Sequence, residues 1–101
     1  MSESTRIVLE LTGPLERAVG RDEVTIPWTG NGRLGDLLLR FCHDYPAAGE
    51  WLDGDGGLGR PDAAFPAGFL VIRDSAALPA KLDTPVVAGD RLTLMPLISG
   101  G

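Results

Sequence analysis

The sequence predicts an α+β domain in which one amphipathic helix packs across a mixed β-sheet. Three observations lead to this fold class. Residues 5–11 and 91–97 alternate apolar and polar side chains, as half-buried strands do. Between them, residues 33–45 carry apolar side chains at helical spacing. An amphipathic helix needs an apolar surface to cover, and the alternating strands supply it.

The length and composition predict a single domain over residues 1–101. Of the 101 residues, 44% are hydrophobic and 23% are charged, which are ordinary fractions for a globular protein. The net charge of −5 argues against nucleic acid as a partner, because phosphate binding needs clustered lysine and arginine. The N-terminus lacks the pattern of a signal peptide, and no apolar run approaches the roughly 20 residues of a membrane helix. We therefore expect a soluble cytoplasmic protein without a membrane partner.

The first two strands are expected at residues 5–11 and 23–28. In the first, Ile7, Leu9 and Leu11 share one face, and Val8 lies on the other. The connecting segment holds Gly13-Pro14 and Gly20, which are typical turn residues. The pattern predicts an N-terminal hairpin with a short connection.

The helix is expected over residues 33–45, with Asn31 or Gly32 as its N-cap and Pro46 marking its end. Residues 46–68 are rich in glycine, proline and aspartate. They predict a long loop, with a short helical turn near residues 50–52. A loop of this length in a small domain is either functional or mobile.

Two further strands are expected towards the C-terminus. Residues 69–74 form a compact apolar run, and residues 75–90 read as turns with one possible short strand. In the last strand Leu92 and Leu94 point one way and Thr93 and Met95 the other, and Pro96 ends or edges the strand. The face that carries Val8, Thr93 and Met95 is a candidate binding surface.

Two glycine-rich motifs in the loop carry little weight. Residues 54–59 match a dinucleotide-binding pattern, but Arg60-Pro61 follows where that pattern needs a helix. The same segment begins like a calcium loop, yet Ala64 stands where the bidentate glutamate belongs. A plain glycine loop is the better interpretation.

Catalytic and metal sites are also disfavoured. Cys42 and His43 are adjacent on the predicted helix, so their side chains point about 100° apart. Cys42 belongs to the apolar face and His43 to the solvent side. The single histidine excludes a histidine-rich metal site, and the carboxylates show no spacing suited to acid–base chemistry. We expect no bound metal or cofactor, and a protein that is not an enzyme in its own right.

The tail over residues 97–101 is the most informative segment. Leu97, Ile98 and Ser99 are uncharged, and Gly100 and Gly101 follow. Glycine lacks a Cβ, so a diglycine end can enter a channel too narrow for other residues. An extended tail reaches about 17 Å, at about 3.3 Å per residue. A carboxylate at its end could thus react in a neighbouring protein's active site.

At this point the chain resembles the ubiquitin-like β-grasp sulfur carriers of the MoaD/ThiS type, over nearly its whole length. The motifs "RIVLEL", "RLGDLLLRF", "GFLVIRD" and "AGDRLTLMPLISGG" fall in the family's order, and Gly89-Asp90 and the diglycine are the specific elements. The proline-containing tail is similar to the small subunit of molybdopterin synthase. The long insert and "ELTGPLERAVG" also look like the ubiquitin-related modifier of tRNA thiolation. Arg33, Met95 and Leu97 depart from the family's usual threonine, aromatic residue and second proline.

The resemblance implies a β-grasp fold and a carrier role. An E1-like adenylating enzyme, which uses ATP and Mg²⁺, would activate Gly101, and a sulfur donor would convert it to a thiocarboxylate. A downstream synthase would accept the sulfur, in molybdopterin, thiamin, cysteine, tRNA thiolation or a specialised metabolite. In that scheme Gly100, which has no side chain, keeps the tail narrow enough to enter the partner's active site. The expected partner contacts are Val8, Phe69, Met95, Pro96, Leu97, Ile98 and Ser99.

Three alternatives remain open from the sequence. The same diglycine serves ubiquitin-like modifiers that form isopeptide bonds, and Lys81 is the only lysine, which disfavours lysine-linked chains of this protein. The chain could instead be a β-grasp interaction module whose tail is incidental, or act as the small subunit of a sulfur-transferring synthase.

Overall fold

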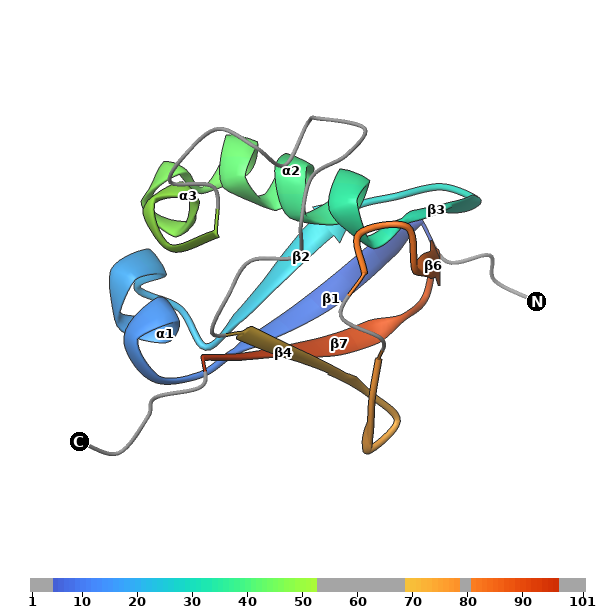
Figure 1. The fold of residues 1–101 in the computed structure, drawn as a ribbon. Coiled ribbons are helices and arrows are strands. Elements are labelled where there is room, and N and C mark those ends of the chain that lie inside the picture. Colours follow the sequence, from blue (N-terminus) through green and yellow to red (C-terminus); the bar gives the residue numbers. More distant parts are fainter. Residues whose placement is uncertain (1–4, 53–68, 79–80, 97–101) are drawn as a thin grey trace.

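The computed structural model describes residues 5–52, 69–78 and 81–96, in which helices lie on one side of a mixed sheet (Figure 1). The sheet of the described residues has five strands in the order β2-β1-β7-β4-β5. β1 and β7 run parallel, and the other neighbouring pairs run antiparallel. The strands are β1 (Arg6–Leu11), β2 (Glu23–Pro27), β4 (Phe69–Arg73), β5 (Ala76–Ala77) and β7 (Arg91–Pro96). These findings confirm the α+β fold class.

The connection between β1 and β2 is a helix, not the short turn predicted. The two strands do pair, but α1 (Gly13–Val19) lies between them. Pro14 stands in its first turn, where a missing N–H costs nothing. Gly20, with φ +84°, ends the helix in the left-handed conformation that glycine adopts freely. Leu15 is fully buried and ties α1 to the core.

The main helix, α2 (Leu34–Asp44), agrees with the prediction, and a second helix follows it directly. This is α3 (Pro46–Leu52), so the loop predicted over residues 46–68 is wrong for its first part. Ala48 and Leu52 are buried and give α3 an apolar side. Residues 53–68, with the motif at 54–59, lie outside the described residues.

A second, two-stranded sheet lies beside the start of α2. It pairs β3 (Asn31–Arg33) with β6 (Pro85–Val87) in antiparallel register. Asn31 and Gly32 are therefore strand residues, and Arg33 is the N-cap of α2, contrary to the N-cap predicted.

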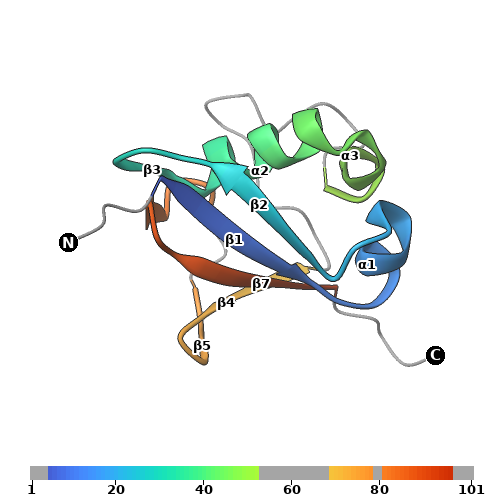
Figure 2. The same ribbon diagram turned by 180° about the vertical axis from the view of Figure 1, so that it is seen from behind.

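The core lies between the sheet and the helices (Figures 1 and 2). Every second side chain of β1, β2, β4 and β7 points to it, as strand geometry requires. The three helices that the structure describes all lie on this face, and none of them covers the opposite, outer face of the sheet. Among the described residues, no helix is long and apolar enough to cross a membrane. The large side chains that are fully enclosed are Ile7, Leu9, Leu15, Val24, Ile26, Leu34, Leu37, Leu38, Phe41, Val71, Leu92 and Leu94.

Candidate functional site

The outer face of the sheet carries a partly exposed apolar strip. Met95 of β7 stands opposite Leu70 of β4, and Thr93 stands opposite Ile72. All four are partly exposed, and the residues between them, Val71 in β4 and Leu94 in β7, are buried. We name Leu70, Ile72 and Met95 the apolar strip. It lies on β7 and β4, next to the point where β7 ends at Pro96.

Phe69 is not part of this face, so its expected place is wrong. Its side chain is only 8% exposed and belongs to the core cluster with Val71. The run from Phe69 to Ile72 is apolar throughout, so its sequence does not reveal which alternate set points inwards. The structure places Leu70 and Ile72 outside instead. Those two residues were missed for this reason.

Val8 lies on the outer face as predicted, but away from Met95. In the parallel register Val8 stands beside Arg91, whereas Glu10 stands beside Thr93. The row of Glu10, Thr93 and Ile72 therefore lies between Val8 and Met95. Of the contacts expected from the sequence, Met95 belongs to the apolar strip and Val8 lies two rows away on the same face.

A network of charges covers the β1–β2 side of the outer face. Arg91 donates from Nε to Glu10 at 2.7 Å and from Nη2 to Glu23 at 2.5 Å, joining three strands. The hydroxyl of Thr93 donates to the other oxygen of Glu10 at 3.0 Å. The hydrogen bond from Arg91, and next that from Thr93, lowers the pKa of Glu10. The bonds to Glu10 and Glu23 raise the pKa of Arg91. Both shifts favour the charged forms of Glu10 and Arg91.

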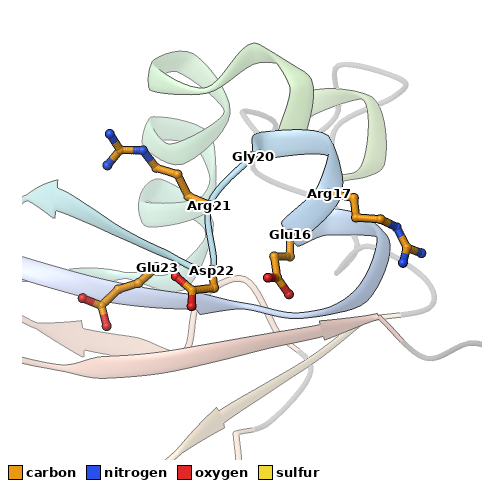
Figure 3. A pocket seen from close by; sticks show the side chains of 6 residues that line it. All are labelled: Glu16, Arg17, Gly20, Arg21, Asp22 and Glu23. Carbon is orange, nitrogen blue, oxygen red and sulfur yellow. The ribbon is translucent and has the colours of Figure 1, made fainter.

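A shallow hollow lies between α1 and the start of β2 (Figure 3). Its lining is Glu16, Arg17, Gly20, Arg21, Asp22 and Glu23, and it is widely open to solvent. Small-molecule sites are usually enclosed and mostly apolar. The hollow does not have that character. The hollow is relevant to the candidate site because Glu23, one of its lining residues, also belongs to the charge network on the outer face.

The base of the tail is fixed on both sides of β7. Pro96 pairs with Phe69 of β4. On the other side, the hydroxyl of Thr12, just past the end of β1, donates to the carbonyl of Leu94 at 3.3 Å. The expected tail residues Leu97, Ile98, Ser99, Gly100 and Gly101 lie outside the described residues and stay predictions.

Cys42 and His43 lie in different environments, as the helix geometry predicts. Cys42 is half-buried and packs against the core, whereas the side chain of His43 is 83% exposed. Within the described residues, no group of three histidine, cysteine, aspartate or glutamate side chains is placed to hold a metal ion.

No protein-family model and no curated protein matches the sequence. Solved structures do. SAMP1 from Haloferax volcanii, a small archaeal modifier protein, has a TM-score of 0.76 at 27% identity, covering 95% of this chain and 99% of that one. A putative molybdopterin converting factor subunit 1 from Pyrococcus furiosus has a TM-score of 0.67 at 18% identity, covering 94% and 100%. Urm1 from Trypanosoma brucei has a TM-score of 0.71 at 18% identity, covering both chains in full.

The similarity to the Pyrococcus and Trypanosoma proteins shows a shared fold. The similarity to SAMP1 shows the same fold at a higher sequence identity. Together they agree with the resemblance drawn from the sequence motifs. The chain has a ubiquitin-like β-grasp fold, and its structural neighbours are a small archaeal modifier protein, a putative molybdopterin converting factor subunit and Urm1.

Proposed function

We propose that the chain is a sulfur carrier whose Gly101 is adenylated by an E1-like enzyme and converted to a thiocarboxylate. One observation supports this most directly. β7 carries Met95 of the apolar strip, occupies the centre of the sheet and leads into the segment that holds Gly100-Gly101. A docking face and a reactive tail are thus parts of one continuous segment.

The chemistry follows from the weakness of a carboxylate as an electrophile. Transfer of AMP from ATP to Gly101 forms a mixed anhydride and releases pyrophosphate. Hydrosulfide then attacks the acyl carbon, a C–S bond forms, the C–O bond to AMP breaks, and a thiocarboxylate results. With a persulfide donor, the acyl disulfide formed first is cleaved by a second thiol. The ATP and Mg²⁺ belong to the activating enzyme, and the chain itself contributes no cofactor.

Each part of this segment has a separate task in the proposal. The apolar strip contacts the activating enzyme, with Met95 as its contribution from β7. Leu97, Ile98 and Ser99 line the partner's channel, and Gly100 lets the backbone pass where a Cβ would not fit. Gly101 then delivers its sulfur to a downstream synthase.

The test is reconstitution with the E1-like enzyme encoded in the same genome, ATP and a sulfide source. Intact mass spectrometry should show an oxygen-to-sulfur exchange, located to Gly101 by fragmentation. Deleting Gly101 should abolish the exchange, while the control His43→Gln, at a side chain that is 83% exposed on α2, should retain it. The absence of both adenylate and mass change in the wild-type protein would refute the proposal.

A second candidate function is protein modification, favoured by the 27% identity to a small archaeal modifier protein. In this case a lysine amine attacks the Gly101 adenylate, forming an isopeptide bond and releasing AMP. The expected result is a set of covalent conjugates in cells that disappears when Gly101 is deleted. Tandem mass spectrometry after trypsin digestion identifies them by a branched peptide carrying a remnant of the tail.

A further inference from the structure

Two carboxylates near the end of the sheet where β7 stops have no internal counter-charge among the described residues. The side-chain carboxylates of Glu16 on α1 and Asp22 before β2 form no hydrogen bond or ion pair with another described residue, whereas those of Glu10 and Glu23 share Arg91. Figure 3 shows the carboxylates of Glu16, Asp22 and Glu23 on the side of the strands. Negative charge is therefore concentrated on that side.

The neighbouring arginines do not neutralise this group. Arg17 and Arg21 line the same hollow, yet their side chains extend in other directions, away from the three carboxylates (Figure 3). Both arginines are exposed. Residues 16–23 hold three acidic and two basic side chains, and the fold points the basic ones away from the acidic ones.

The carboxylates lie at the end of the sheet where the tail begins. β1 and β7 are parallel, so Leu11 and Leu94 lie at the same end. α1 follows β1 and contacts β7, and β2 starts from this end with Glu23. Figure 1 shows α1 beside the point where β7 ends. A partner that receives the tail and covers the apolar strip thus meets Glu16 and Asp22 at the edge of the contact.

We propose that the protein which docks on the apolar strip presents basic side chains opposite Glu16 and Asp22. The inference rests on the proposed function, since the partner is the E1-like activating enzyme. Opposite charges at the rim of an apolar contact steer association and reject partners of the wrong sign. Arg91 is already bound by two carboxylates, so it does not compete for these positions.

The first experiment compares two substitutions of the same kind, Leu70→Glu on the apolar strip and Leu39→Glu on α2. Leu39 is 40% exposed and lies on the helix side of the sheet. The readout is carrier-dependent ATP–pyrophosphate exchange by the activating enzyme. Leu70→Glu should raise the KM for the carrier at least about tenfold with little change in kcat, because it puts a charge into the contact. Leu39→Glu should stay within about twofold.

The second experiment tests the charge complementarity with Asp22→Lys against Glu50→Lys. Glu50 is exposed on α3, so both variants change the net charge equally. At low ionic strength Asp22→Lys should raise KM by about three- to tenfold, and the difference should shrink in high salt, because exposed charges are screened. Glu50→Lys should follow the wild type at each salt concentration.

The outcomes separate this inference from the proposed function. A wild-type chain that supports no exchange refutes the function itself. A functional wild type with equal effects of Leu70→Glu and Leu39→Glu refutes the docking strip. Equal effects of Asp22→Lys and Glu50→Lys refute the basic partner surface. Sedimentation that shows a dimer of this chain, lost in Leu70→Glu while activation is unchanged, assigns the strip to self-association and overturns the proposal.

Discussion

At the scale of single residues, Asp90 fixes the turn that leads into β7. Its carboxylate, with a side chain 14% exposed, accepts hydrogen bonds from the N–H of Val87 at 3.0 Å and from Nη1 of Arg73 at 3.1 Å. Gly89 adopts φ +96°, which favours glycine, and its N–H donates to the carbonyl of Arg6 at 2.7 Å. The Gly-Asp pair that helped to reveal the resemblance therefore determines where the central strand begins.

Asp90→Ala should lower the free energy of unfolding by about 1–3 kcal/mol. The substitution leaves the N–H of Val87 without its acceptor and removes a charge-assisted bond to Arg73. Urea denaturation measures the change. Asp83→Ala is the matched control, because Asp83 is exposed and has no hydrogen bond or ion pair within the described residues, and its effect should stay below about 0.5 kcal/mol. Equal losses in the two variants would contradict the role given to Asp90.

Glu10→Gln should weaken the dependence of stability on acidic pH. Hydrogen bonds from Arg91 and Thr93 lower the pKa of Glu10 in the folded state, below its ordinary 4.5. The unfolded chain then binds the proton more readily, so this stabilisation is present above the ordinary pKa and is lost as pH falls through the folded one. Melting temperatures from about pH 6 down to about pH 3 should fall less steeply for Glu10→Gln than for wild type. Glu50→Gln is the control. If the melting temperature of Glu10→Gln falls as steeply with decreasing pH as that of Glu50→Gln, Glu10 does not make this contribution.

At the scale of elements, the N-terminus of α2 is capped by a distant loop and not by a side chain. The N–H of Leu34 donates to the carbonyl of Thr84 at 2.8 Å, and that of Gly35 donates to the carbonyl of Leu82 at 2.8 Å. Arg33, the N-cap residue, makes no capping hydrogen bond. These tertiary bonds satisfy two of the N–H groups that lack a partner within the helix.

Gly35→Ala should destabilise the protein by about 1 kcal/mol, although alanine normally favours a helix. A Cβ at this position would lie 3.0 Å from Cβ of Leu82 and 3.2 Å from its carbonyl oxygen. That carbonyl accepts the bond from Gly35, so it cannot move away without stretching the bond. Gly49→Ala on α3 is the control, since its Cβ would meet Cys42 at 3.7 Å, an ordinary contact. Thermal unfolding should show opposite signs, with a gain of about 0.5 kcal/mol at Gly49.

The elements with a clear period were predicted, and so were the positions of β2 and β4. β1, β7 and α2 have alternating or helical apolar patterns, and all three were expected within a residue or two. α1 and α3 were missed, because Gly13-Pro14 and Pro46 read as turn signals although proline also suits the first turn of a helix. β3 is stabilised by pairing with β6, some 50 residues away in the sequence, and no local pattern reveals such a pairing.

At the scale of the whole molecule, the residues of the outer face could be predicted only in strands whose alternating pattern shows which side chains point inwards. Met95 alternates with Leu92 and Leu94 in its segment, so its direction followed from sequence. In β4 the unbroken apolar run concealed the phase, and Phe69 was placed on the wrong side. The separation of Val8 from Met95 depends on the register of β1 against β7. The charge network of Arg91 joins residues up to 81 positions apart, beyond the reach of any motif.

The sheet order also predicts how stability is distributed. β7 lies between β1 and β4, and Leu92 and Leu94 are fully buried, whereas β5 pairs only with β4 and both of its alanines are exposed. Central amides should exchange only when the whole domain unfolds, and edge amides by local opening. Hydrogen exchange followed by NMR should therefore find Leu94 slower than Ala77 by a factor on the order of a thousand.

The variant Asp90→Ala distinguishes global from local opening in the same measurement. If Leu94 exchanges through global unfolding, its rate should rise by the factor that corresponds to the loss of stability in urea, about tenfold for each 1.4 kcal/mol. Ala77 should keep its wild-type rate, because its local opening does not require the turn at Asp90 to unfold. An exchange rate of Leu94 that does not respond to Asp90→Ala, or an Ala77 amide as slow as Leu94, would show that β7 is not the most stable part of the fold.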